Sequence, residues 1–239
     1  MMTTFLSKTR LAAAAASLML ALAAQNASAI TVVWSAPEAI NSNADIINPG
    51  NVIRAVNFAP SSQPASIDVN VGGNIIAFTQ AGVTGGTGFF NTSFFDDNNP
   101  AAGTVDADFH QVLDSFRDNS TTSVTISGLV AGETYFVQAF QSDDRGNRTT
   151  TWNINGIGTS FASNTSLFRS AFAIATVTLD GGETSFTFER PGGAGNQVNA
   201  VVVTQAPASN GAIPEPATAV MAGMMLVGLA ARKRRSRVA

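Results

Sequence analysis

The chain has 239 residues, with 13 Lys plus Arg, 16 Asp plus Glu and no cysteine, so cysteine catalysis, disulfides and thiolate metal sites are excluded. Two basic residues lie near the N-terminus and five near the C-terminus, which leaves residues 30–212 with six arginines against fifteen carboxylates, a net charge near −9. Such a surface disfavours nucleic acid and anionic lipid, and it favours divalent cations or neutral polymers such as polysaccharide.

The first 29 residues have the pattern of a signal peptide. Lys8 and Arg10 precede an Ala- and Leu-rich run that is too short to span a membrane. Ala27 and Ala29 then give the small-x-small pattern that signal peptidase recognises. We expect cleavage after Ala29, so that the mature chain begins at Ile30.

Residues 30–205 carry the pattern of β-strands. Segments rich in β-branched and aromatic residues, several of which alternate apolar with polar positions, cover residues 31–34, 67–71, 75–79, 123–126, 134–140, 150–154, 171–179, 184–188 and 200–204. Glycine-rich turns separate them at the spacing of a sandwich. The sequence therefore predicts an all-β fold, an antiparallel β-sandwich.

One segment, residues 106–118, departs from this pattern. Its apolar side chains recur at helical spacing, at Phe109, Val112, Leu113 and Phe116. Asp106 or Asp108 is placed to cap the N-terminus of a helix. We expect one short helix that covers the sandwich.

Acidic side chains cluster just before and within this helix. Asp96 and Asp97, followed by Asp106 and Asp108, supply hard oxygen donors of the kind that calcium binds. Their spacing does not match an EF-hand loop, and a solvated acidic loop explains them equally well. Calcium is therefore a candidate ligand at these four residues.

The stretch from residue 126 to 145 predicts a strand, a glycine turn and a second strand. The turn has the order Gly-Leu-x-x-Gly-x-x-Tyr, and the second strand ends at Ser142-Asp143-Asp144-Arg145. It resembles surface β-sandwiches of the galactose-binding-like type, and fibronectin-type modules share the turn. The resemblance implies that Leu129 fills the core and that Tyr135 closes a corner. Asp143 and Arg145 are candidate ligand-binding residues, with a turn held by local ion pairs as the alternative.

The two tryptophans are candidates for a sugar-binding face, because flat aromatic rings can pack against pyranose rings. Trp34 lies in the first expected strand and Trp152 in a central one, where core packing is the default for both. Trp152 is the stronger candidate for a ligand face, because threonines and an asparagine surround it.

The C-terminal residues 213–239 have three parts in a fixed order. Pro214, Glu215 and Pro216 come first, followed by an apolar run over 217–231 and then five basic residues. Because the two prolines prevent a helix from running through Glu215, an apolar helix can start only after them. A helix of that length reaches roughly 22 Å, short of a comfortable span, and the basic end favours the cytoplasmic side. A tail anchor and a buried helix of a soluble fold are the alternatives.

This three-part segment resembles the PEP-CTERM sorting signal of Gram-negative bacteria. The resemblance implies recognition at the inner membrane by an exosortase, removal of the helix, and export to the cell surface or extracellular matrix. Pro214, Glu215 and Pro216 would then be the processing site, and residues 206–212 a linker.

Taken together, these patterns predict an exported, non-catalytic sandwich that binds polysaccharide or other envelope components. The sequence contains no GxSxG or HExxH motif and no phosphate-binding loop, and we expect no catalytic residues. A structural matrix component without a small ligand is an alternative. An enzyme that acts on extracellular polysaccharide is another, and it would need two carboxylates across a cleft.

Overall fold

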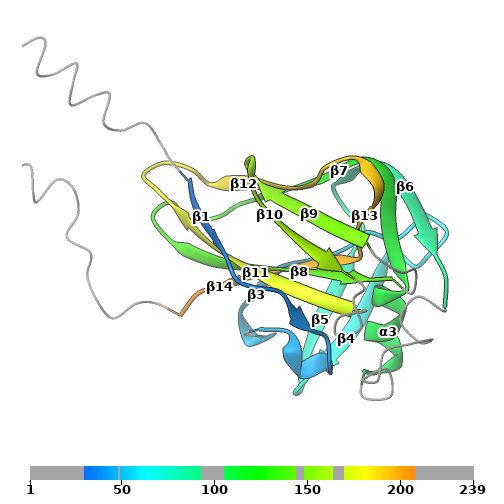
Figure 1. The fold of residues 1–239 in the computed structure, drawn as a ribbon. Helices are drawn as coiled ribbons and strands as arrows, with labels where there is room; N and C mark the ends of the chain where they lie inside the picture. The colour runs from blue at the N-terminus through cyan, green and yellow to red at the C-terminus, as the bar shows by residue number, and fades with distance from the viewer. Residues whose placement is uncertain (1–29, 48, 93–104, 144–147, 164–169, 208–239) are drawn as a thin grey trace, which may run out of the picture. The chain divides into compact units, whose positions relative to one another are not determined.

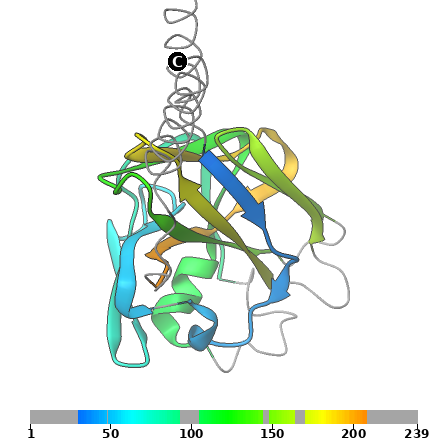
Figure 2. The same cartoon turned by 90° about the vertical axis from the view of Figure 1, so that its left-hand side faces the viewer.

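The structure is a computed structural model that describes residues 30–47, 49–92, 105–143, 148–163 and 170–207. The chain divides into two compact units, Met1–Ala206 and Pro207–Ala239, and all the described strands belong to the first. The expected all-β sandwich is confirmed: two sheets pack face to face (Figures 1 and 2).

The larger sheet contains eight strands. Its order is β1 (Ile30–Trp34), β11 (Ser170–Leu179), β8 (Thr134–Ser142), β14 (Ala200–Gln205), β3 (Val52–Asn57), β5 (Asn74–Thr79) and β4 (Ser66–Val71), while β2 (Glu38–Ala39) pairs with β11. The expectation of antiparallel pairing holds across this sheet except between β3 and β5, which run parallel.

The smaller sheet contains six strands, and all its described pairs are antiparallel. Its order is β10 (Ile157–Ser163), β9 (Arg148–Ile154), β12 (Ser185–Arg190), β7 (Ser115–Ser127) and β13 (Gly193–Val198), while β6 (Val83–Phe90) pairs with β7.

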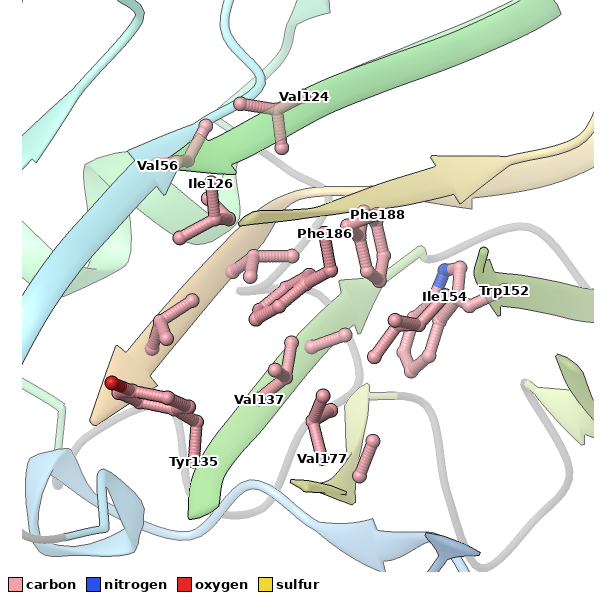
Figure 3. Packing of buried hydrophobic residues seen from close by; sticks show 14 of the residues in the cluster. Val56, Val124, Ile126, Tyr135, Val137, Trp152, Ile154, Val177, Phe186 and Phe188 are labelled. Carbon is pink, nitrogen blue, oxygen red and sulfur yellow. The ribbon is translucent and has the colours of Figure 1, made fainter. Parts of the chain in front are cut away.

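Alternate residues of the larger sheet face two different cores, because successive side chains of a strand point to opposite faces. Tyr135, Val137 and Ala139 of β8 face the smaller sheet and pack with Trp152, Phe186 and Phe188 in the core between the sheets (Figure 3). Phe140 faces the other way and joins a second core beneath the helix. A single strand such as β8 therefore serves both cores.

The helix α3 (Ala107–Leu113) lies over that second core, beside β4 (Figure 1). Asp106 caps it as expected, since its carboxylate accepts from the Phe109 amide at 2.8 Å. The expected extension to residue 118 is wrong. Ser115 starts β7, and Phe116 pairs with Phe89 of β6 and stacks on its ring.

Two 3-10 turns, η1 (Asn43–Asp45) and η2 (Pro49–Asn51), complete the described elements. The sequence patterns did not predict β2, β3, β6, β10, β13 or the first half of β7. Glycine explains the miss in β6, because it weakens a strand pattern. A Cβ on Gly85 would lie 2.1 Å from the Thr121 carbonyl oxygen, so the close approach of β6 to β7 requires glycine there.

The turn between β7 and β8 forms the expected corner. Leu129 is buried, and the Tyr135 hydroxyl accepts from the Val130 amide at 2.8 Å. Gly128 and Gly132 have φ of 77° and 82°, in the left-handed region that favours glycine. The structural role of this turn is therefore confirmed.

Several expected features lie outside the described residues. These are the signal peptide with Ala27 and Ala29, the candidate ligands Asp96, Asp97 and Arg145, and the sorting signal with Pro214, Glu215 and Pro216. Among the described residues, no helix is both long enough and apolar enough to cross a membrane.

Candidate functional site

Strand ends from both sheets meet at one end of the sandwich, which we call the polar end. The end of β8 pairs with the start of β11, and the start of β14 lies between the ends of β8 and β3. Buried polar residues gather here, each at most 7% exposed: Gln141, Ser142, Asp143, Thr150, Ser170, Arg190, Asn196, Gln197 and Asn199. A buried polar group is unfavourable without a partner, so these residues depend on hydrogen bonds within the protein.

Asn196 of β13 links β13 to β9 at this end of the smaller sheet. Its side-chain oxygen accepts from the Thr151 amide at 3.0 Å, and its nitrogen donates to the Thr151 carbonyl at 3.1 Å. The same nitrogen donates to the Pro191 carbonyl at 2.9 Å. The side chain thus supplies the ladder bonds that a neighbouring strand would otherwise give to β9.

Gln197 and Asn199 link the smaller sheet, the larger sheet and α3. The Gln197 side-chain nitrogen donates to the Ser142 carbonyl, and the Gln197 backbone carbonyl accepts from the Trp152 indole at 3.1 Å. Asn199 accepts from the Ser142 amide at 2.8 Å and donates to the Leu113 carbonyl at the end of the helix. These amides therefore hold the strand ends in place.

Gln141 is the exception among these side-chain amides. It is 0% exposed, and among the described residues neither its side-chain oxygen nor its side-chain nitrogen has a hydrogen-bond partner. It lies two residues beyond Ala139, so it shares the face of β8 that is turned towards the smaller sheet. Leaving such a group unpaired lowers the stability of the folded protein by about 1–3 kcal/mol, so unpaired buried amides are rare in native proteins.

Asn57 is another buried side-chain amide for which the described part of the chain supplies no partner to either atom. It ends β3 and pairs in register with Ala200, the first residue of β14, so it lies at the same end of the molecule. Its side chain faces the opposite side from that of Val56, which packs in the inter-sheet core. Unpaired amides thus occur at the polar end on both faces of the larger sheet.

Arg190 brings a buried cation to the same region. Its guanidinium donates to the Thr122 hydroxyl at 2.8 Å, to the Pro191 carbonyl at 3.2 Å and to the Ser120 carbonyl. Burial lowers the pKa of Arg190, and the carboxylate of Asp118 acts in the opposite direction. The cation is thus held by uncharged acceptors, and it shares the Pro191 carbonyl with Asn196.

The structure does not place Trp152 on a ligand face. The side chain is 0% exposed and packs against Trp34 and Phe188, with ring centroids 6.3 and 6.4 Å away. Figure 3 shows Trp152 beside Phe188 in the core. The expectation of an exposed ring at this position is corrected, because the polar neighbours of Trp152 alternate to the outer face while the ring points inwards. Core packing, the default for this residue, is what the structure shows.

The other predicted site residues fall in different places. Asp143 is 0% exposed and belongs to the polar end, while Arg145 lies outside the described residues. Asp106 caps α3 and binds the side chain of Asn43, and Asp108 is exposed on the first turn. Among the described residues, no three acidic or histidine side chains come together as a metal site.

Sequence reasoning missed Gln141, Asn196 and the roles of Gln197 and Asn199. One signal was present, because Gln141 continues the apolar face formed by Tyr135, Val137 and Ala139. A polar residue in phase with a buried face is unusual in a half-buried strand. The hydrogen bonds of Asn196 depend on a strand, β13, that the sequence did not predict.

Neither a family model nor a curated protein matches the chain. Solved structures with a distant likeness include the plant receptor-like kinase ANX2 (TM-score 0.47, 15% identity) and the ANXUR2 extracellular domain from Arabidopsis thaliana (TM-score 0.46, 15% identity), each covering 64% of this chain and 48% of the other. A calcium-binding mutant of Bacteroides uniformis β-glucuronidase 2 has a TM-score of 0.39 at 14% identity, over 59% of this chain and 18% of that one. The chain spans about half the length of the two receptor chains. With scores below 0.5, these likenesses do not assign it to a family.

Proposed function

We propose that this protein is an exported, non-catalytic β-sandwich of the galactose-binding-like type that binds a neutral polysaccharide at its polar end. The unpaired amide of Gln141 is the observation that carries the proposal. Its oxygen accepts and its nitrogen donates, so it complements neighbouring sugar hydroxyls, which do both. Gln141 is 0% exposed, so a sugar hydroxyl meets this amide only when the strand ends of the polar end separate, and it would then supply partners that the described residues do not.

The surroundings of Gln141 hold it in place in the free protein. The side chains of Asn196, Gln197 and Asn199 bond to the backbone of the strand ends around it. The net charge near −9 of residues 30–212 favours a neutral polymer over an acidic one.

Thermal unfolding of the full chain with soluble polysaccharides tests the proposal. Dextran, a galactan and a β-glucan serve as neutral probes, and alginate as the acidic control. We expect one neutral polymer to raise the midpoint by roughly 5–10 °C at a hundred times its Kd, and alginate to have no effect. The absence of any shift would contradict binding and favour a structural matrix component.

Two glutamine variants make this test specific. Gln141→Leu should abolish the shift. Gln138→Leu is the matched control, because Gln138 is equally buried on the same strand and both its amide atoms are bonded, to Ile47 and Asp45. It should lower the midpoint of the free protein but keep the shift. Equal loss in both variants would contradict a role for Gln141, and release of reducing sugar during incubation would contradict a non-catalytic role.

We propose further that the C-terminal segment sorts the protein, with exosortase as the processing enzyme at the inner membrane. The order of Pro214-Glu215-Pro216, apolar run and basic tail supports this. Replacing the three residues with alanine should leave the unprocessed chain in the membrane fraction of the host. Normal processing of this variant would contradict the sorting role and leave the polysaccharide site untouched.

A further inference from the structure

A hollow opens where the parallel strands β3 and β5 separate. The two strands pair in register only at Ala55 with Phe78 and at Val56 with Thr79. Before these positions they diverge around a cavity of about 340 Å³, lined by residues 52–55 of β3 and residues 75–77 and 79 of β5. We call it the β3–β5 hollow. Its volume lies at the small end of the range for small-molecule sites, about 300–1,000 Å³.

The lining of the hollow is apolar except for Arg54 and Thr79. Ile53 and Ile75 are 42% and 63% exposed, although isoleucine is normally buried. Two exposed isoleucines on facing strands form an apolar rim that water solvates poorly. The hollow therefore suits an aliphatic group.

Arg54 is the only charged residue in this lining. One of its terminal nitrogens donates to the Ala81 carbonyl at 2.7 Å, and its Nε is buried without an acceptor. Ala81 lies two residues beyond the end of β5, so the guanidinium is held near the end of the hollow where the strands pair. The hollow thus has an apolar rim and a cation beside it.

We propose that the β3–β5 hollow binds a medium-chain aliphatic carboxylate. The alkyl chain packs between Ile53 and Ile75, and the carboxylate accepts from the guanidinium of Arg54. Arginine favours carboxylates because its N–H groups form two parallel bonds, which here would come from the two terminal nitrogens of Arg54. Within the described ranges of the chain, no acidic residue lines the hollow to oppose the carboxylate.

Octanoate is the probe, with 1-octanol and octyltrimethylammonium as chain-matched controls that lack the carboxylate. Calorimetric titration of the full chain should show octanoate binding about tenfold or more tightly than either control. Equal affinity for octanol, or no binding of octanoate, would overturn the proposal. This comparison needs no variant, so it does not depend on how a mutant folds.

Variants then locate the site. Arg54→Met keeps an unbranched apolar side chain but removes the guanidinium, and it should weaken octanoate about tenfold while leaving octanol unchanged. Ile75→Ser should weaken both ligands, whereas Ile157→Ser, at an exposed isoleucine of β10, should weaken neither. Equal effects of the two serine variants, or full affinity in Arg54→Met, would overturn the assignment. Polysaccharide binding at Gln141 is measured separately, so either proposal can fail alone.

Discussion

The two ends of the sandwich are built from different chemistry. At the corner end, Tyr135, Phe186, Leu129 and Leu179 are buried, and the Tyr135 hydroxyl bonds to the Val130 backbone. At the polar end, amides, hydroxyls and a guanidinium occupy the interior between the same two sheets. The corner end is stabilised by apolar burial, whereas the polar end depends on hydrogen bonds that are individually modest and unfavourable to leave unmade.

The two ends also differ in how many of their buried polar groups have hydrogen-bond partners. At the corner end, the tyrosine hydroxyl and the turn backbone already bond to each other. At the polar end, Gln141 and Asn57 are buried, and neither amide has a partner in the part of the chain that the structure describes. The stability of the free protein does not explain these two amides, but a ligand at Gln141 would explain the first of them.

The largest expected effect comes from the corner end. Phe186→Ala removes a side chain that is 2% exposed from the inter-sheet core, and we expect it to lower the free energy of unfolding by about 3–5 kcal/mol. Urea unfolding of the full chain measures this. The polysaccharide-induced shift should persist in the variant, because Gln141 is untouched. A loss below about 1 kcal/mol would mean that this end is less tightly packed than its burial indicates.

At the polar end, Asn196→Leu should lower the free energy of unfolding by about 2–3 kcal/mol, because the backbone groups of Thr151 lose their partners. Hydrogen exchange should show the Thr151 amide exchanging faster in the variant. Unchanged protection of that amide would contradict the bridging role of Asn196.

Tyr135→Phe should lower the free energy of unfolding by about 0.5–1.5 kcal/mol, because the Val130 amide loses its acceptor while the ring still fills the core. Urea unfolding again provides the measurement. A neutral substitution would show that water satisfies this amide.

The sequence predicted the corner and the helix cap because both are local. The Leu129 to Tyr135 turn and the Asp106 cap each depend on residues within a few positions of one another. Strands whose pairing depends on distant partners were missed, as in β6 and β13, where glycines weaken the pattern. The unpaired state of Gln141 could not be predicted, because it follows from how two sheets meet.

The smallest expected effect concerns the proposed calcium ligands. Asp106→Asn keeps a side chain that can cap α3, so we expect a change within about 0.5 kcal/mol, whereas Asp106→Ala should lose about 0.5–2 kcal/mol. Repeating the measurement with calcium tests the metal. Stabilisation by calcium that disappears in Asp106→Asn would indicate that the carboxylate binds the ion, and no effect of calcium would leave Asp106 as a cap alone.

The most direct test of the claim that Gln141 is unpaired in the free protein compares two glutamines of β8, each 0% exposed. Urea unfolding of the full chain without ligand should show Gln138→Leu destabilised by about 1–3 kcal/mol, because the Ile47 amide and the Asp45 carbonyl lose their partners. Gln141→Leu should be as stable as the unmodified protein or more stable, because an unpaired amide is replaced by an apolar group. Equal destabilisation by both substitutions would contradict the claim that Gln141 is held unpaired for a ligand.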